Sequence, residues 1–240
     1  MTNCCKVNGF VFKKEDRLDT DRDFSIFTEE FGRLKVFGKA IRKITSKLKS
    51  GIDVFSISEI EFVQGKSKKT LTDAIFIQKF SNIISSPKRF EVANQIVKVL
   101  DDFVKEQERD DGLFYLLKDS FEKLNDNSLK KENCNLIYYY FLWNFFSILG
   151  FKPELQKCAN CFSELNQHKI YFSDSEGGVI CEKCLTTKNK SKKINSDVIK
   201  ILRLILEKNW QTIFKLKIDV SSQKILREVS DDYYFYLLNK

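Results

Sequence analysis

The chain has 240 residues, of which 42% are hydrophobic and 31% charged, with only two prolines and nine glycines. This balance is typical of one or two globular domains with a sizeable core, and it excludes a fibrous or low-complexity protein. Lysine and arginine total 41 against 33 acidic residues, and the net charge of +8 suits a polyanionic partner without proving one.

The longest stretch without a charged residue is 133–151, which carries three asparagines and a serine. We therefore expect no membrane span. The N-terminus shows no basic segment followed by an apolar one, so no secretory signal is expected either. These features predict a cytoplasmic chain whose seven cysteines do not form a disulfide framework.

Five segments rich in Val, Ile, Phe and Thr predict strands in the first eighty residues. They cover 7–12, 24–28, 34–41, 52–63 and 71–77. In the third segment, positions 34, 36, 38 and 40 face one way, and positions 33, 35, 37 and 39 face the other. Five short strands favour a small closed barrel, because closure removes exposed sheet edges.

Helical periodicity begins after Ser86-Pro87, where proline occupies the first turn. Apolar residues then recur at helical spacing over 90–104, 113–124, 136–148, 198–206 and 225–237. The segment 136–148 is apolar almost all round, so it is expected at the centre of the core. The lysine-rich run 188–193 is interpreted as a solvated linker. The chain is thus predicted to be α+β, with a barrel domain at 1–81 and a helical domain at 82–240 that contains a cysteine-bearing module at about 154–187.

Two Cys-x2-Cys pairs, separated by nineteen residues, predict a tetrahedral metal site. The four ligands are Cys158, Cys161, Cys181 and Cys184. Thiolate sulfur favours Zn²⁺ over magnesium or calcium, and a closed four-sulfur shell indicates one structural zinc per chain. The alternatives are reduced cysteines packed as small hydrophobic residues, or a redox-active pair. The single histidine, His168, is interpreted as a loop residue because the sulfurs already complete the shell.

The stretch 32–50 holds seven basic residues and no acidic one. Cations that contact phosphates, beside an aromatic ring that stacks on a base, are typical of barrels that bind single strands. The candidate contacts are Arg33, Lys35, Phe37, Lys39, Arg42, Lys43, Lys47 and Lys49. A second basic cluster at Lys66, Lys68 and Lys69 would widen the patch. The alternative is a lysine-rich solvated hairpin.

Catalytic constellations are missing from the sequence. The segment 32–40 superficially resembles a phosphate-binding loop, but its glycines are one residue too far apart and no Ser or Thr follows Lys39. One histidine leaves no room for a Ser-His-Asp triad or an H-E-x-x-H site. The acidic pairs at 101–102 and 110–111 are interpreted as solvated helix surfaces or ends. We expect a binding protein and not an enzyme; the alternatives are a zinc-ribbon RNA-binding protein, a metal-dependent nuclease and a structural assembly subunit.

Taken in order, these features resemble the bacterial RecO family of DNA repair and recombination mediators. Residues 38–46 are similar to its G-A-R-R-x-x-S-like segment, although Ile41 replaces a usual second basic residue, and 113–117 resembles its L-F-x-L-L helix. The aromatic helix followed by 149–161 resembles the family's L-L-x-x-x-G-x-x-P-x-L-x-x-C-x-x-C signature.

The resemblance implies an N-terminal OB-fold, a helical domain and a zinc module. It implies binding of single- and double-stranded DNA, annealing of complementary strands, and action with RecR to load RecA onto DNA coated by single-strand-binding protein (SSB). The SSB C-terminal tail is an implied partner, although no motif here assigns its pocket. A cytoplasmic, nucleoid-associated location is implied as well.

Overall fold

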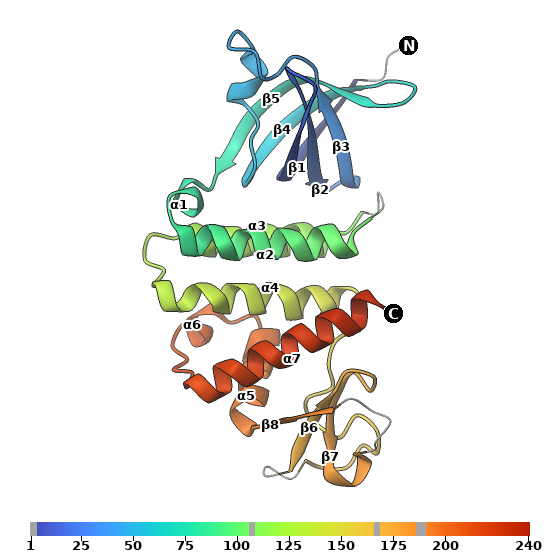
Figure 1. Cartoon of the computed structure of the whole chain (residues 1–240), viewed down its shortest axis with the longest axis vertical. Coiled ribbons are helices and arrows are strands. Elements are labelled where there is room, and N and C mark those ends of the chain that lie inside the picture. The colour runs from blue at the N-terminus through green and yellow to red at the C-terminus, as the bar shows by residue number, and fades with distance from the viewer. Residues whose placement is uncertain (1–3, 106–108, 166–168, 186–190) are drawn as a thin grey trace. The chain divides into compact units, whose positions relative to one another are not determined.

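The structure is a computed structural model that describes residues 4–105, 109–165, 169–185 and 191–240. Its described elements are five N-terminal strands, a set of helices and a small second sheet (Figure 1). The chain divides into two compact units, Met1–Cys134 and Asn135–Lys240. None of the described helices is long and apolar enough to cross a membrane.

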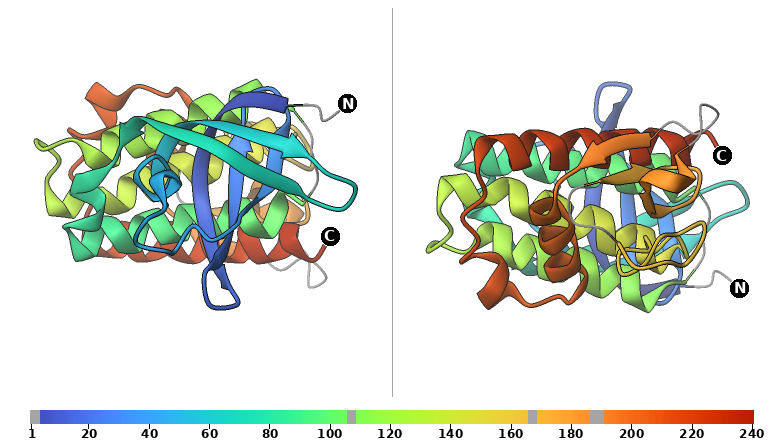
Figure 2. Two further views of the ribbon diagram at one scale, coloured as in Figure 1. Left: turned by 90° about the horizontal axis from the view of Figure 1, so that it is seen from above. Right: turned by 90° about the horizontal axis from the view of Figure 1, so that it is seen from below.

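The five N-terminal strands close into a barrel in the order β1-β2-β3-β5-β4. Their bounds are β1 Cys4–Arg17, β2 Asp21–Thr28, β3 Gly32–Gly38, β4 Ser56–Gln64 and β5 Lys69–Lys79. Neighbours pair antiparallel, except for a short parallel contact between β3 and β5. The turn between β1 and β2 projects from the barrel in both views of Figure 2. The expected fold class, an OB-type strand domain followed by helices, is confirmed.

The barrel core is made by the alternating apolar positions of the strands. Val11, Ile26, Val36 and Ile60 are completely buried. Along β3 the even positions from 34 to 38 are buried and the odd positions face outward, so the predicted alternation is confirmed over the length of the strand. Alternation fixes the register here because a shift by one residue would bury the cations.

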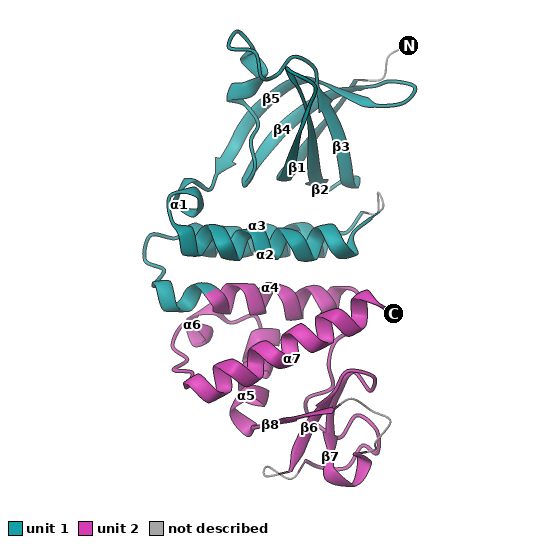
Figure 3. Ribbon diagram, viewed as in Figure 1, with its two compact units in different colours: residues 1–134 teal, residues 135–240 magenta. Residues whose placement is uncertain are grey.

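Three helices complete the first unit, shown in teal in Figure 3: α1 Ser81–Ile84, α2 Pro87–Phe103 and α3 Asp111–Asn125. An aromatic layer joins them to the barrel, with ring centroids 4.5 Å apart for Phe10 and Phe121 and 5.6 Å apart for Phe55 and Phe90. The compact unit therefore extends past residue 81. The domain boundary expected there stays a prediction.

The second unit is built around α4 Cys134–Ile148, whose Trp143 and Phe146 are completely buried. The other helices are α5 Ser196–Leu206, α6 Trp210–Ile213 and α7 Val220–Leu238. The Trp143 ring stacks on Tyr233 with centroids 5.4 Å apart, and its Nε1 donates to Ser230 Oγ at 3.0 Å. The central position predicted for this apolar helix is confirmed within its unit.

A three-stranded antiparallel sheet of order β7-β6-β8 accompanies these helices. Its strands are β6 Ile170–Ser173, β7 Gly178–Cys181 and β8 Ser191–Ile194, and short 3-10 helices lie at η1 Lys47–Ser50, η2 Lys131–Asn133 and η3 Glu182–Cys184. The linker interpretation is wrong for residues 191–193, because they form β8 beside β6 and Lys192 pairs with Asp232 at 2.6 Å. The rest of that lysine run lies outside the described residues.

Candidate nucleic-acid interface and metal centre

Arg33 fastens the barrel to helix α2. Its guanidinium donates to the Asp101 carboxylate and to the main-chain oxygen of Val104, and it lies 5.2 Å from the centre of the Phe12 ring. The side chain is only 21% exposed. Arg33 is therefore held at a helix end and is not a free cation on the barrel surface. The interpretation of Asp101 as a solvated residue is therefore wrong, because its carboxylate forms ion pairs with Arg33 and Lys13.

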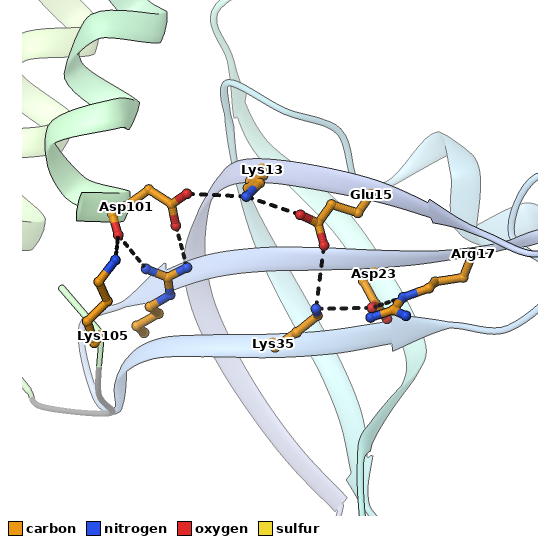
Figure 4. Close-up of polar contacts among 8 residues, drawn as sticks. Lys13, Glu15, Arg17, Asp23, Lys35, Asp101 and Lys105 are labelled. Atoms are coloured by element: carbon orange, nitrogen blue, oxygen red, sulfur yellow. Dashed lines mark hydrogen bonds and ion pairs between the residues drawn. The ribbon is translucent and has the colours of Figure 1, made fainter. Parts of the chain in front are cut away.

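The outward face of β3 carries a chain of ion pairs that continues from this contact (Figure 4). Lys35 Nζ lies 3.2 Å from an Asp23 oxygen and 3.5 Å from a Glu15 oxygen. Lys13 bridges Glu15 and Asp101 at 3.1 and 3.2 Å. The carboxylates thus offset much of the positive charge that the β3 sequence suggested.

The pKa of Asp101 reflects this network. Burial favours the neutral acid, but hydrogen bonds from Arg33 and Lys13 outweigh burial and lower the pKa below its usual value. A hydrogen bond from Lys13 likewise lowers the pKa of Glu15. Both carboxylates therefore stay ionised at neutral pH and hold their cationic partners in place.

The third strand ends earlier than expected, at Gly38 instead of Ile41. Ala40 adopts a left-handed conformation with φ of 52°, and its N–H donates to Asp21 Oδ1 at 2.7 Å. This turn takes Lys39 out of the sheet. The chain then returns to the β1–β2 turn, where the Arg42 N–H donates to the Thr20 carbonyl at 2.9 Å. The Arg42 guanidinium lies 3.5 Å from Asp16.

Four exposed lysines follow on the connection between β3 and β4, and we call them the loop cations. They are Lys39, Lys43, Lys47 and Lys49. Among the residues that the structure describes, none of these ammonium groups forms an ion pair or a hydrogen bond. Gly51 lets the connection pass close to β5, since a Cβ there would lie 1.6 Å from the Ala74 oxygen. The loop cations therefore stand on a connection that packs against the barrel.

Phe37 lies half-buried on β3, where a lysine from the turn between β4 and β5 covers its ring. Lys68 Nζ is 3.5 Å from the centre of its ring, an attractive cation–π contact. The register Phe37↔Thr70 places the beginning of β5 beside the end of β3. The second basic cluster at 66–69 is thereby brought next to Phe37. The sequence alone did not reveal this contact, because no local pattern connects the two turns.

The predicted metal ligands come together in the second unit. The Sγ atoms of Cys158, Cys161, Cys181 and Cys184 all lie within 4.8 Å of one another. The Cys161–Cys181 separation is 3.8 Å, which matches the edge of about 3.8 Å in a tetrahedron built from Zn–S bonds of about 2.3 Å. The four cysteines can therefore hold a metal ion. His168 lies outside the described residues.

Backbone contacts build this centre. The Ala159 N–H donates to the Val179 carbonyl at 2.7 Å, and the Val179 N–H donates to the Glu154 carbonyl at 2.8 Å, so the first knuckle is held on β7. Gly178 permits this approach, because a Cβ there would lie 2.4 Å from the Glu154 oxygen. The Cys181 N–H donates to Cys158 Sγ at 3.4 Å, a contact that stabilises a thiolate.

The cysteines of this cluster differ in pKa in the absence of a metal ion. A hydrogen bond from the Ser163 hydroxyl lowers the pKa of Cys161 to about 6. The hydrogen bond with Cys161 raises the pKa of Cys184 to about 12. Because metal binding requires thiolates, it must displace protons from this cluster, and metal affinity falls as the pH is lowered.

Together these features define a class: a protein with an OB-type barrel, a basic connection on that barrel, and helices that accompany a four-cysteine cluster able to hold a metal ion. The family profile described as "Recombination protein O N terminal" matches residues 1–80, and the one described as "Recombination protein O C terminal" matches residues 85–240. The chain belongs to the RecO family, which is a family of DNA repair and recombination proteins.

Curated relatives agree along nearly the whole chain. A DNA repair protein RecO from Dehalococcoides mccartyi is 33% identical over 224 residues, covering 93% of this chain and 85% of the relative. The RecO proteins of Alkaliphilus metalliredigens and Moorella thermoacetica are 27% and 25% identical, and cover 98% and 100% of this chain. In those two matches, 94% and 88% of the relative is covered.

Proposed function

We propose that this chain is a non-enzymatic recombination mediator that binds single- and double-stranded DNA and anneals complementary strands. With RecR it helps to load RecA onto DNA coated by SSB, in the cytoplasm and on the nucleoid. Membership in the RecO family supports this role. The observation that carries the DNA-binding part is the set of exposed loop cations on the barrel, which form no ion pair with any residue that the structure describes.

DNA binding follows from the electrostatics of the loop cations. Each lysine that contacts a phosphate releases condensed counterions, so the affinity falls as salt concentration rises. Within the described part of the chain, the loop cations have no carboxylate partner to lose on binding. Arg33 and Lys35 already have carboxylate partners, and Arg42 is partly engaged with Asp16. We therefore assign the main phosphate contacts to the loop cations. Phe37 and Lys68 lie at the edge of the proposed DNA-binding surface.

Annealing requires no nucleotide hydrolysis, because forming a duplex from two complementary strands is itself favourable. A protein that holds a strand by its phosphates leaves the base edges open to a second strand. No catalytic group is required for this step.

Zinc is the metal we assign to the four cysteines, one ion per chain. Soft thiolate ligands select it over harder cations, and the sulfur separations suit its tetrahedral geometry. A four-sulfur shell leaves no open position, so the ion stabilises the fold and takes no part in chemistry.

Strand annealing in the presence of SSB tests the proposed function. Two complementary labelled oligonucleotides, each coated by SSB, are mixed with the full chain, with and without RecR. We expect duplex to form faster with the chain than without it, and no cleavage of either strand when magnesium is added. An unchanged annealing rate contradicts the mediator role, and magnesium-dependent cleavage by the pure chain points to a nuclease. Competition with an RNA of the same sequence separates DNA binding from RNA binding.

A further inference from the structure

Two exposed aliphatic side chains stand on the segments next to the loop cations. Ile44 is fully exposed, and Leu18, in the turn between β1 and β2, is 89% exposed. Leu18 also adopts a left-handed backbone conformation with φ of 47°, which is unfavourable for leucine. A single exposed aliphatic residue needs no explanation. Here two of them, one in a strained conformation, lie on segments that are joined by hydrogen bonds next to the loop cations, which suggests a shared role.

The backbone fixes where Ile44 is presented. The Lys43 N–H donates to the Ala40 carbonyl, and the Ser46 N–H donates to the Lys43 carbonyl, both at 3.1 Å. These bonds form two consecutive turns, and Ile44 occupies a corner of the second. Its side chain is thus held away from the barrel core by an ordered loop.

Hydrogen bonds also join this loop to the turn that carries Leu18. The Arg42 guanidinium donates to the Leu18 carbonyl at 3.4 Å, and the Arg42 N–H donates to the Thr20 carbonyl at 2.9 Å. Ile44 follows Arg42 by two residues. Hydrogen bonds therefore join the two segments that carry these aliphatic side chains.

The charge around Ile44 selects its partner. All four loop cations lie within five residues of it, and no acidic residue occurs from 32 to 50. In the neighbouring turn, Asp16 is paired with Arg22 and Arg42, Asp21 accepts from Ala40, and Asp19 is exposed next to Leu18. The positive charge is therefore concentrated on the connection that carries Ile44. That connection repels a basic partner and attracts a chain that is both polyanionic and rich in flat apolar surfaces, which describes a single nucleic-acid strand.

We propose that Ile44, together with Leu18 on the turn that is hydrogen-bonded to the same loop, wedges between neighbouring bases of a bound single strand and unstacks them. The inference rests on the proposed function, because the loop cations must first hold the phosphates. Aliphatic wedges are known to unstack base steps when cations hold the backbone on either side. The wedge would act on the same strand that the loop cations hold for annealing, so it connects DNA binding with annealing.

Fluorescence of 2-aminopurine provides the test, because stacking on neighbouring bases quenches its emission. A single strand with 2-aminopurine between two adenines is titrated with the full chain at low salt, and binding is measured separately by anisotropy. We expect the wild-type chain to raise the emission severalfold at saturation. The double variant Ile44→Ser/Leu18→Asn should lose most of that rise while its affinity changes by no more than about threefold. Asparagine is chosen because it tolerates the left-handed conformation.

Control variants separate the wedge from other effects. Ile44→Leu keeps an aliphatic side chain and should retain the emission rise. Val220→Ser removes an aliphatic side chain that is 83% exposed on α7, and it should leave the emission unchanged. If the double variant, at saturation, raises the emission as much as the wild-type chain does, the proposed wedge is wrong but the proposed function still stands. Absence of DNA binding by the wild-type chain overturns the proposed function, and the wedge with it.

Discussion

The guanidinium of Arg33 on β3 donates to the carboxylate of Asp101 on α2, and this pair joins the basic strand to the helical part of its unit. The same guanidinium donates to the Val104 carbonyl at the end of α2, one of the carbonyls that helix geometry leaves without a partner. A residue that the sequence suggests as a DNA contact is therefore held by two structural partners, the Asp101 carboxylate and the Val104 carbonyl.

Removing this guanidinium should destabilise the first unit. We expect Arg33→Ala to lower the free energy of unfolding by about 1–3 kcal/mol, because it leaves a partly buried carboxylate and a helix-end carbonyl without their donor. Urea unfolding followed by circular dichroism measures the loss. The matched control is Arg109→Ala, whose pair with Asp111 is solvent-exposed and should matter less. Equal losses in the two variants would show that the contact does not join barrel and helix.

Stability should depend on pH through Asp101. Its pKa in the folded chain is lowered, so the ionised form contributes stability that is fully present above the unfolded value of about 3.9 and is lost as the pH falls through the folded value. We expect the difference in unfolding free energy between the wild-type chain and Asp101→Asn to be constant from about pH 6 to about pH 8. It should shrink below about pH 4. Urea unfolding at a series of pH values measures it. A difference that persists undiminished in acid contradicts the assignment.

The four-cysteine centre should hold one zinc ion and stabilise the second unit. Cys184→Ser should abolish stoichiometric zinc and lower the melting temperature reported by tryptophan fluorescence, since Trp143 and Trp210 both lie in that unit. Elemental analysis and thermal unfolding measure the two effects, with a chelator as an independent way to remove the metal. Cys4→Ser is the control, since exposed Cys4 lies outside the cluster and its loss should change neither value. Freshly reduced wild-type protein without zinc would remove the metal from the account.

Much of the fold was predictable because its determinants are local in sequence. The two-residue alternation of β3 correctly predicts that Leu34 and Val36 are buried, and the uniformly apolar segment 136–148 correctly predicts a core helix. The cysteine spacing was equally informative, because knuckle geometry confines each pair of ligands to four residues. The early end of β3 was not predictable, since it depends on the bond from the Ala40 N–H to Asp21 at the start of the neighbouring strand β2.

The charge state of the candidate interface was less predictable, because ion pairing depends on residues distant in sequence. Nothing near Lys35 indicates that Glu15 and Asp23 lie beside it, and nothing near Arg33 points to Asp101. A count of cations from 32 to 50 therefore overstates the charge available to a polyanion. The extension of the first unit past residue 81 likewise depends on contacts between residues distant in sequence, since its aromatic layer joins the barrel to the helices.

The salt dependence of DNA binding tests the central claim most directly, because the loop cations are proposed as the phosphate contacts. Binding of a fluorescent single strand is measured over a range of salt concentrations for three chains: the wild type, Lys39→Ala/Lys43→Ala and Lys35→Ala. The account predicts that the slope of log affinity against log salt falls by about 0.7 for each loop cation removed, and that it stays unchanged for Lys35→Ala, whose cation is paired. An unchanged slope in the double variant, or an equal loss per lysine in Lys35→Ala, would contradict it.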